Sequence, residues 1–270
     1  MLSLALGPFT LSMQHLALLL ALGAALLLAA RLGPRGPGDA QAWVWRLFLL
    51  SLVAARAVFV VQYWPQYSGH GWQVIDLRDG GFSPFSGLAF ALAAAALLLW
   101  RRPALRRGVL AGGGLGIGLW LAAGAALPWW QQGSALPASV LQQADGRTTR
   151  LAAYQGKPLV VNLWATWCPP CRREMPVLVA AQQAHPEVRF VFVNQGESLG
   201  VVANFSATTG LSLSQVLFDP DGALAAEVGA HALPTTLFYD AEGKRVGSHL
   251  GELSEASLAH ALKMLKPSMP

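Results

Sequence analysis

Two cysteines, Cys168 and Cys171, are the residues of this chain best suited to chemistry, and the sequence holds no others. They stand in a Cys-Pro-Pro-Cys segment, after a predicted strand and at the start of a predicted helix. Three-residue spacing on a helix puts both thiols on one face, close enough to form a disulfide. The free N–H groups and the dipole at a helix start stabilise a thiolate, so Cys168 is expected to attack as the more exposed sulfur, and Cys171 to resolve from a buried position. The predicted reaction is thiol–disulfide exchange through a mixed disulfide.

Three other uses of a Cys-x-x-Cys pair remain open, although the sequence favours each of them less. Structural zinc needs about four ligands, and the six histidines are scattered. Covalently attached haem needs a histidine directly after the second cysteine, where this chain has Arg172. A passive disulfide would close a very short loop and gain little from it. We therefore expect no metal and no cofactor beyond the redox-active Cys168–Cys171 pair.

The elements around this pair predict an α/β sheet with helices on both faces. Short β-branched and aromatic runs indicate buried strands, and a turn-forming segment between the last two strands indicates a hairpin. The expected strands are Lys157–Trp164, Val188–Asn194, Ser214–Phe218, Thr235–Tyr239 and Arg245–Leu250, and the expected helices are Glu174–Gln183, Val201–Thr209, Ala223–Val228 and Ser254–Leu265. Ser254 is expected to cap the final helix.

The first half of the chain has a different composition. Its residues 1–134 contain nine Arg, no Lys, no Glu and three Asp, whereas the second half is close to neutral. The arginines lie between apolar runs, which is typical of membrane proteins and argues against a nucleic-acid-binding surface. A helix needs roughly 20 apolar residues to cross a bilayer. The runs that predict such helices are Phe9–Ala30, Val44–Val61, Phe85–Trp100 and Val109–Trp129.

The arginine distribution predicts how these four helices are oriented. Arg31 and Arg35 follow the first run, and four further arginines separate the third from the fourth. Loops rich in Arg stay in the cytoplasm, so the segment after the fourth run is expected outside, in the bacterial periplasm. Residues 1–13 carry no Lys or Arg, and a cleaved signal peptide is therefore not expected.

Two features inside the apolar runs allow alternative interpretations. Gly112, Gly114, Gly116 and Gly118 permit close helix approach, within one chain or between two copies. Arg56 is an ionisable residue inside a run, which is a functional hypothesis by default. Composition alone favours a snorkelling side chain with its charge near the headgroups.

The first half resembles the prolipoprotein diacylglyceryl transferases. The resemblance rests on Ala55–Arg56 at the end of a span, on Tyr63 in the outer loop and on Gly80–Gly81–Phe82–Ser83. Phe85 stands where the family has a histidine, and Ser86 replaces a glycine. We therefore expect a shortened relative without transferase activity, which anchors the chain or docks a partner. A lipid-modifying enzyme with an appended redox domain is the alternative.

The second half resembles the TlpA/DsbE-type thioredoxin-fold disulfide reductases. The motifs are WATWCPPCRREMP around the cysteines and the later segment that contains Ala-Leu-Pro-Thr-Thr. The resemblance implies that Pro234 is a cis-proline facing the cysteine pair, and that Leu233 and Thr235 offer backbone hydrogen bonds to a substrate strand. It also implies that Glu174 exchanges a proton with Cys171 and that Trp167 touches substrate.

These inferences combine into one prediction. The chain is expected to contain a transmembrane domain at 1–130, a linker at 131–139 and a thioredoxin-like domain at 140–270. It would be a membrane-anchored periplasmic thiol:disulfide oxidoreductase that reduces protein disulfides, apocytochrome c among them. Because the membrane half has no cysteine, a DsbD- or CcdA-like membrane protein is the expected electron donor. A docking protein whose cysteines stay oxidised is a further alternative.

Overall fold

The computed structural model describes residues 3–6, 9–34, 39–69, 71–131 and 135–265. The chain divides into two compact units, Gln14–Leu127 and Pro128–Pro270, and the short segment Met1–Met13 groups with the second. Each unit is described by itself. Arg35 and residues 132–134 of the expected linker lie outside the described residues.

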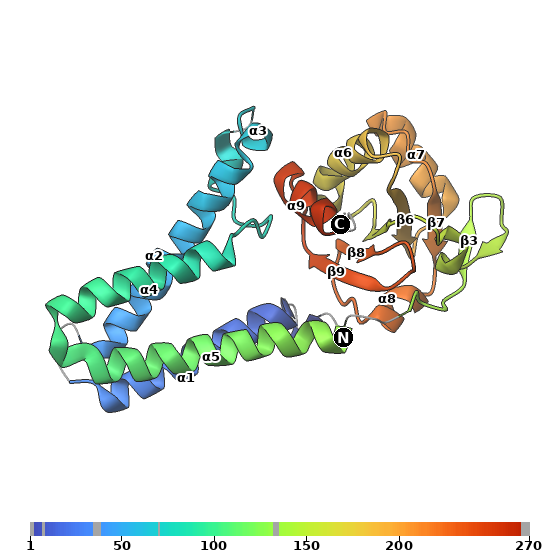
Figure 1. Cartoon of the computed structure of the whole chain (residues 1–270). Helices are drawn as coiled ribbons and strands as arrows, with labels where there is room; N and C mark the ends of the chain where they lie inside the picture. Colours follow the sequence, from blue (N-terminus) through green and yellow to red (C-terminus); the bar gives the residue numbers. More distant parts are fainter. Residues whose placement is uncertain (1–2, 7–8, 35–38, 70, 132–134, 266–270) are drawn as a thin grey trace. The chain divides into compact units, whose positions relative to one another are not determined.

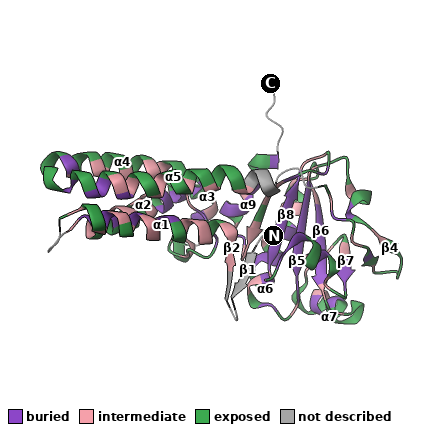
Figure 2. Ribbon diagram, turned by 90° about the horizontal axis from the view of Figure 1, so that it is seen from below, coloured by how far each residue is buried: buried purple, intermediate pink, exposed green. Residues whose placement is uncertain are grey.

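Four helices of the N-terminal unit are long and apolar enough to cross a bilayer. They are α1 (Met13–Leu32), α2 (Ala40–Gln62), α4 (Pro84–Arg101) and α5 (Arg106–Gln131). The shorter elements α3 (Trp64–Tyr67), η1 (Gly71–Val74) and η2 (Pro103–Leu105) lie between them. Many side chains on α1, α2, α4 and α5 are exposed (Figure 2), as expected of helices that face lipid.

The first helix begins later than expected. Phe9–Ser12 is not helical but forms strand β2, which pairs antiparallel with β1 (Ser3–Leu6). Aromatic and β-branched residues favour strands, and Ser and Thr compete for backbone hydrogen bonds inside helices. The segment that opens with Phe-Thr-Leu-Ser therefore joins the hairpin, and the helix starts at Met13.

Glycines bring the helices of this unit close together. A Cβ atom on Gly112 would lie 2.5 Å from the carbonyl oxygen of Ala25, and one on Gly116 would lie 2.8 Å from the Ala25 Cβ. These two glycines therefore pack α5 against α1 within one chain. Gly114 and Gly118 have nothing within 4 Å of such a Cβ atom.

The C-terminal unit is built on a seven-stranded sheet with the order β4-β3-β7-β6-β5-β8-β9. Its strands are β3 (Leu141–Gln143), β4 (Thr148–Thr149), β5 (Leu159–Trp164), β6 (Arg189–Gln195), β7 (Val216–Asp219), β8 (Thr235–Tyr239) and β9 (Arg245–Leu250). The central strands β5, β6 and β7 run parallel, while β8 and β9 are antiparallel (Figure 1).

Helices cover both faces of this sheet, which confirms the predicted fold class. Side chains of α6 (Pro169–Ala184), α7 (Leu199–Thr209) and α9 (Glu255–Leu265) pack on one face, in a core that includes Trp164 and Phe192. The 3₁₀ turn η3 (Leu151–Tyr154) and α8 (Ala223–Val228) pack on the other. Ser254 Oγ accepts the N–H of Ser257 at 3.1 Å and caps α9 as predicted.

Candidate active site

The cysteine pair lies where β5 leads into α6. Cys168 is the N-cap residue of α6, and its Sγ accepts the backbone N–H of Cys171 at 3.3 Å. The two residues form a disulfide with their Cα atoms 5.3 Å apart. Pro169 and Pro170 occupy the first helical turn, where the N–H that proline lacks has no helical partner. The local sequence thus places the Cys168 sulfur at the positive end of the helix dipole.

The two cysteines differ only slightly in solvent exposure. Cys168 is 3% exposed and Cys171 is fully buried, which is the predicted order, although the disulfide form buries both. Trp167, directly before Cys168, is 67% exposed. Trp164 is buried and packs against Phe205, with ring centroids 5.5 Å apart. One tryptophan is therefore part of the core and the other is accessible beside the cysteines.

Glu174 lies one helical turn after Cys171 and is completely buried. Its Oε1 accepts the side-chain N–H of Asn162 at 2.8 Å, and its Oε2 accepts the backbone N–H of Leu253 at 2.9 Å. Burial disfavours the charged form and raises the pKa of this carboxyl to about 8, although both hydrogen bonds oppose the rise. A carboxyl group with this pKa can hold or release a proton near neutral pH.

The turn before β8 joins the same region. The Leu233–Pro234 peptide bond is cis, as the resemblance implied. Leu233 packs against the apolar cluster that contains both cysteines. Thr235 pairs with Leu163 of β5 and with Leu250 of β9, so its backbone lies within the sheet. Leu233 and Pro234 therefore precede the sheet ladder, and the Pro234 carbonyl accepts the Gly251 N–H at 2.9 Å.

Glu197 was not singled out by the sequence, yet it holds the loop that leads to Cys168. Its carboxylate accepts the backbone N–H of Thr166 at 2.8 Å and the Thr166 hydroxyl at 2.5 Å. It also accepts the side-chain N–H of Asn194 at 2.7 Å. Thr166 is two residues before Cys168, while Glu197 follows β6. Strands β5 and β6 are parallel neighbours, so the loops that follow them lie at the same edge of the sheet. This shared edge is the only signal in the sequence that relates Thr166 to Glu197.

Comparison with known proteins assigns this unit. The family model described as Redoxin matches residues 131–265, which is half of the chain. The chain belongs to the redoxin family. Residues 2–119, which precede the redoxin unit, match the family model of prolipoprotein diacylglyceryl transferase. The predicted fusion of the two families is therefore confirmed.

Curated relatives share the redoxin unit. Thiol-disulfide oxidoreductase ResA of Bacillus subtilis (strain 168) is 34% identical over 139 residues, which cover 50% of this chain and 76% of the relative. ResA of Geobacillus thermodenitrificans is 35% identical over 137 residues, covering 50% and 78%. A solved thiol:disulfide interchange protein from Chlorobium tepidum is 30% identical, covers 48% of this chain and 94% of its own, and has a TM-score of 0.42. The two ResA relatives show that the redoxin unit is a thiol-disulfide oxidoreductase, the predicted class of enzyme.

The transferase-like residues form a separate cluster in the N-terminal unit. Phe85, at the position of the family's histidine, is 76% exposed in the first turn of α4. The hydroxyl oxygens of Ser83 and Ser86 are 2.9 Å apart. Phe85 offers no group that could take or give a proton at this position.

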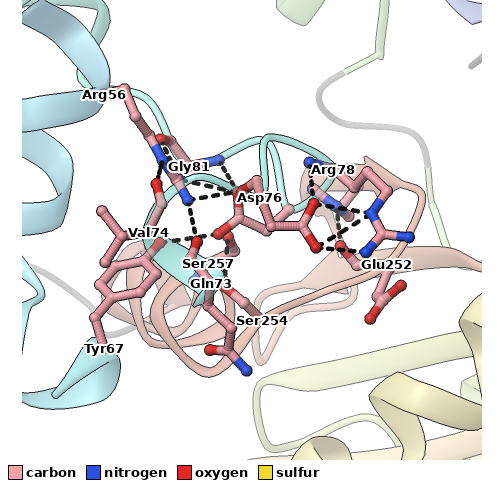
Figure 3. Close-up of polar contacts among 12 residues, drawn as sticks. Arg56, Tyr67, Gln73, Val74, Asp76, Arg78, Gly81, Glu252, Ser254 and Ser257 are labelled. Carbon is pink, nitrogen blue, oxygen red and sulfur yellow. Dashed lines mark hydrogen bonds and ion pairs between the residues drawn. The ribbon is translucent and has the colours of Figure 1, made fainter. Parts of the chain in front are cut away.

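Arg56, for which composition alone favoured a side chain reaching towards the headgroups, is buried within the N-terminal unit. The residue is only 6% exposed, and its Nη1 lies 2.9 Å from the Oδ1 atom of Asp79. Figure 3 shows the Arg56 guanidinium directed at the loop that carries Val74 and Gly81. Tyr67 donates its hydroxyl to the other Asp79 oxygen at 2.9 Å. Because Asp79 comes 23 residues after Arg56, no local pattern in the sequence reveals the pair.

Proposed function

We propose that this chain is a membrane-anchored disulfide reductase that works outside the cytoplasm through Cys168 and Cys171. The observation that carries the proposal is the placement of the Cys168 sulfur at the N-terminus of α6, where it accepts the Cys171 N–H. In the reduced protein the same contact and the helix dipole would favour the thiolate over the thiol. The thiolate is the species that attacks disulfides.

The reaction balances as two exchange steps. The Cys168 thiolate attacks one sulfur of a substrate disulfide, which breaks that bond, forms a mixed disulfide and releases the second substrate sulfur as a thiolate that takes up a proton. Cys171 then loses its proton and attacks the Cys168 sulfur, which breaks the mixed disulfide and releases the remaining substrate sulfur as a thiolate that also takes up a proton. The substrate leaves with two thiols, and the protein keeps the Cys168–Cys171 disulfide. Two electrons pass to the substrate. Of the two protons it takes up, one balances the proton lost by Cys171 and the other comes from solvent, because Cys168 reacts as a thiolate.

Glu174 is the proposed acceptor of the Cys171 proton. It lies one turn further along the same helix, so the two side chains share a face. Its pKa of about 8 is close to that of an ordinary thiol, which suits proton transfer between the two groups. Asn162, where thioredoxin itself has an aspartate, holds Glu174 through a hydrogen bond to Oε1.

Substrate is proposed to bind along the turn before β8. The backbone of Leu233 would pair with an extended substrate strand, and the exposed Trp167 would pack on it. Pro234 shapes this turn, and Thr235 fixes it from within the sheet, where its hydroxyl donates to the Ala232 carbonyl at 2.7 Å. Apocytochrome c and mispaired extracytoplasmic proteins are the proposed substrates.

The membrane unit is proposed to anchor the enzyme and fix its side of the bilayer. Arg31 lies in the last turn of α1, and Arg101, Arg102, Arg106 and Arg107 surround η2. With both Arg-bearing loops in the cytoplasm, the redoxin unit is outside. Since the membrane unit has no cysteine, electrons must come from another membrane protein, of DsbD or CcdA type. Lipid transfer is not proposed, because the exposed Phe85 supplies no acid or base.

A trapping experiment tests the reductase. In Cys171→Ser the resolving thiol is absent, so the mixed disulfide formed by Cys168 should persist and carry the substrates into mass spectrometry. Cys168→Ser/Cys171→Ser is the matched control and should trap nothing. Alkylation in cells should find a measurable share of the native pair reduced. A pair that is always oxidised, together with an empty trap, would contradict the proposal.

A further inference from the structure

The loop between α2 and α4 carries large apolar side chains on its surface. Trp72, Ile75 and Leu77 are 73%, 63% and 57% exposed. Ile75 N–H donates to the Trp72 carbonyl at 3.2 Å, as in a 3₁₀ turn. Side chains three residues apart on such a turn project from the same side, so Trp72 and Ile75 form one apolar edge.

This loop folds back beside α2 instead of extending from its end. The Ser83 N–H donates to the carbonyl of Ala55 at 3.1 Å, seven residues before α2 ends at Gln62. At 1.5 Å per residue this contact lies about 10 Å below the end of α2. A Cβ atom on Gly81 would lie 2.5 Å from the Phe59 ring, so the preceding residues also lie along α2.

The helix lengths agree with this depth. Helix α2 has 23 residues and α4 has 18, which correspond to about 35 Å and about 27 Å. If both helices reach the opposite membrane surface, α4 begins below the level at which α2 ends. The loop residues before Pro84 must then pass through the outer boundary region of the bilayer.

Arg56 supplies the hydrogen bonds that a loop at this depth lacks from water. Its Nε donates to the Val74 carbonyl at 3.0 Å, and its Nη2 donates to the Gln73 and Asp76 carbonyls, both at 2.8 Å. Its Nη1 donates to Asp79 and to the Gly81 carbonyl. All five N–H donors of the guanidinium are thereby used. Irregular backbone is tolerated at membrane depth only when its polar groups are satisfied by protein.

The charged residues of the loop set a limit on how deep it lies. Arg78 has a side chain that is 62% exposed, and its Nη2 lies 2.6 Å from Asp76 Oδ2. An exposed arginine is favourable among lipid headgroups and unfavourable in the hydrocarbon core. Tryptophan likewise prefers the membrane interface. The loop is therefore suited to the boundary between headgroups and acyl chains.

We propose that residues 72–77 are a lipid-contacting segment, in which Trp72, Ile75 and Leu77 enter the interface of the outer leaflet while Arg56 holds the backbone behind them. The occupant of this apolar surface is bilayer lipid, because the loop lies alongside α2, where the apolar side chains of Val58 and Val61 are also exposed. The proposal rests on the proposed membrane anchoring. In this proposal all five guanidinium N–H groups of Arg56 hold the loop, and none is left to bind a substrate headgroup.

Nitroxide labelling of the full chain in lipid nanodiscs tests this proposal. A single cysteine is placed at Ile75 in the Cys168→Ser/Cys171→Ser background, and the label's accessibility to oxygen and to a water-soluble nickel chelate is compared. Leu92, exposed on α4, is the lipid-facing control, and Ala144, exposed between β3 and β4, is the aqueous control. The oxygen-to-nickel ratio at Ile75 should be several-fold above that at Ala144. A label at Trp72 should behave in the same way.

Two results would overturn the proposal, and they differ in what else they affect. An aqueous ratio at Ile75 with a lipid ratio at Leu92 would reject the loop and leave the anchor intact. Aqueous ratios at both positions would reject the anchor together with the loop. Adding Arg56→Lys to the Ile75 label should lower the ratio severalfold, because lysine cannot hold the four carbonyls; an unchanged ratio would reject the part assigned to Arg56.

Discussion

Asp79 and Glu174 are buried carboxyl groups in different units, and their surroundings are opposite. Asp79 faces the Arg56 guanidinium and also accepts the Tyr67 hydroxyl and the Gly81 N–H. Glu174 accepts two N–H groups, from the Asn162 side chain and the Leu253 backbone, and both donors are neutral. The Arg56 guanidinium ties Asp79 into a buried ion pair, whereas a buried carboxyl group without a paired cation tends to take up a proton. The comparison separates a structural ion pair from a group suited to proton transfer.

The pH dependence of stability should show the largest difference. The unfolded Glu174 carboxyl loses its proton near pH 4.5 and the folded one near pH 8. Between these values the folded state binds more protons, so its stability falls as pH rises, by roughly 5 kcal/mol in total for this group. Glu174→Gln should lack this loss. Pulse proteolysis of the oxidised full chain in urea, read on the redoxin unit at pH 4 and pH 9, measures it; parallel profiles for parent and variant would contradict the assignment.

Asp79→Asn should strongly destabilise the membrane unit. The substitution leaves the Arg56 charge buried without a counter-charge, which costs about 3–5 kcal/mol. Resistance of the α2–α4 loop to protease during SDS titration in mixed micelles reports the change. Asp76→Asn is the matched control, because it removes a partner of the exposed Arg78 in the same loop and should cost less than about 1 kcal/mol. Equal losses in the two variants would remove the distinction between the buried Arg56–Asp79 ion pair and the exposed Arg78–Asp76 ion pair.

Glu174→Gln should also slow one chemical step and spare the other. Removal of a general base lowers the rate of the step it assists by about 100-fold, and here that step is the attack of Cys171 on the mixed disulfide. Rapid acid quench with a model disulfide peptide would show the mixed disulfide accumulating, while its formation by Cys168 is nearly unchanged. If both steps slow equally, Glu174 has a general structural role and no specific one.

Glu197→Gln should have a smaller effect. The variant keeps the shape but loses the charge that accepts hydrogen bonds from Thr166 and Asn194. Hydrogen bonds to charged groups contribute about 1.5–3 kcal/mol, and part of that should be lost in the urea assay. Glu187→Gln is the control, because the Glu187 carboxylate lies on the surface 3.1 Å from His185 Nδ1, and it should stay within about 1 kcal/mol.

Local patterns predicted much of the redoxin unit. The bounds of α8, β8 and β9 are those expected from Ala223–Val228, Thr235–Tyr239 and Arg245–Leu250, because turn residues flank each of them. The helix at the cysteines begins at Pro169, as the cysteine motif predicted, although the residue pattern alone indicated a helix only from Glu174. Two prolines and two arginines hide the helical period there, although proline suits a first turn. Strands β3 and β4 are short and polar and were not predicted.

What the sequence did not reveal depends on distant partners. Asp79 meets Arg56, Glu197 meets Thr166 and Asn162 meets Glu174 only when separate elements come together. The cysteine pair, in contrast, is defined within four consecutive residues, and its disulfide follows from helical spacing. Motifs of this kind can be found in a sequence, whereas buried polar networks require the fold.

The acidity of the Cys168 thiol tests the central claim most directly. In reduced full-length Cys171→Ser the backbone N–H that contacts the sulfur is retained, and Cys168 is the only thiol. The rate of iodoacetamide alkylation measured from pH 4 to pH 10 gives its pKa. The account predicts a pKa clearly below the value of about 8.5 for an ordinary thiol. A pKa at or above that value would contradict it.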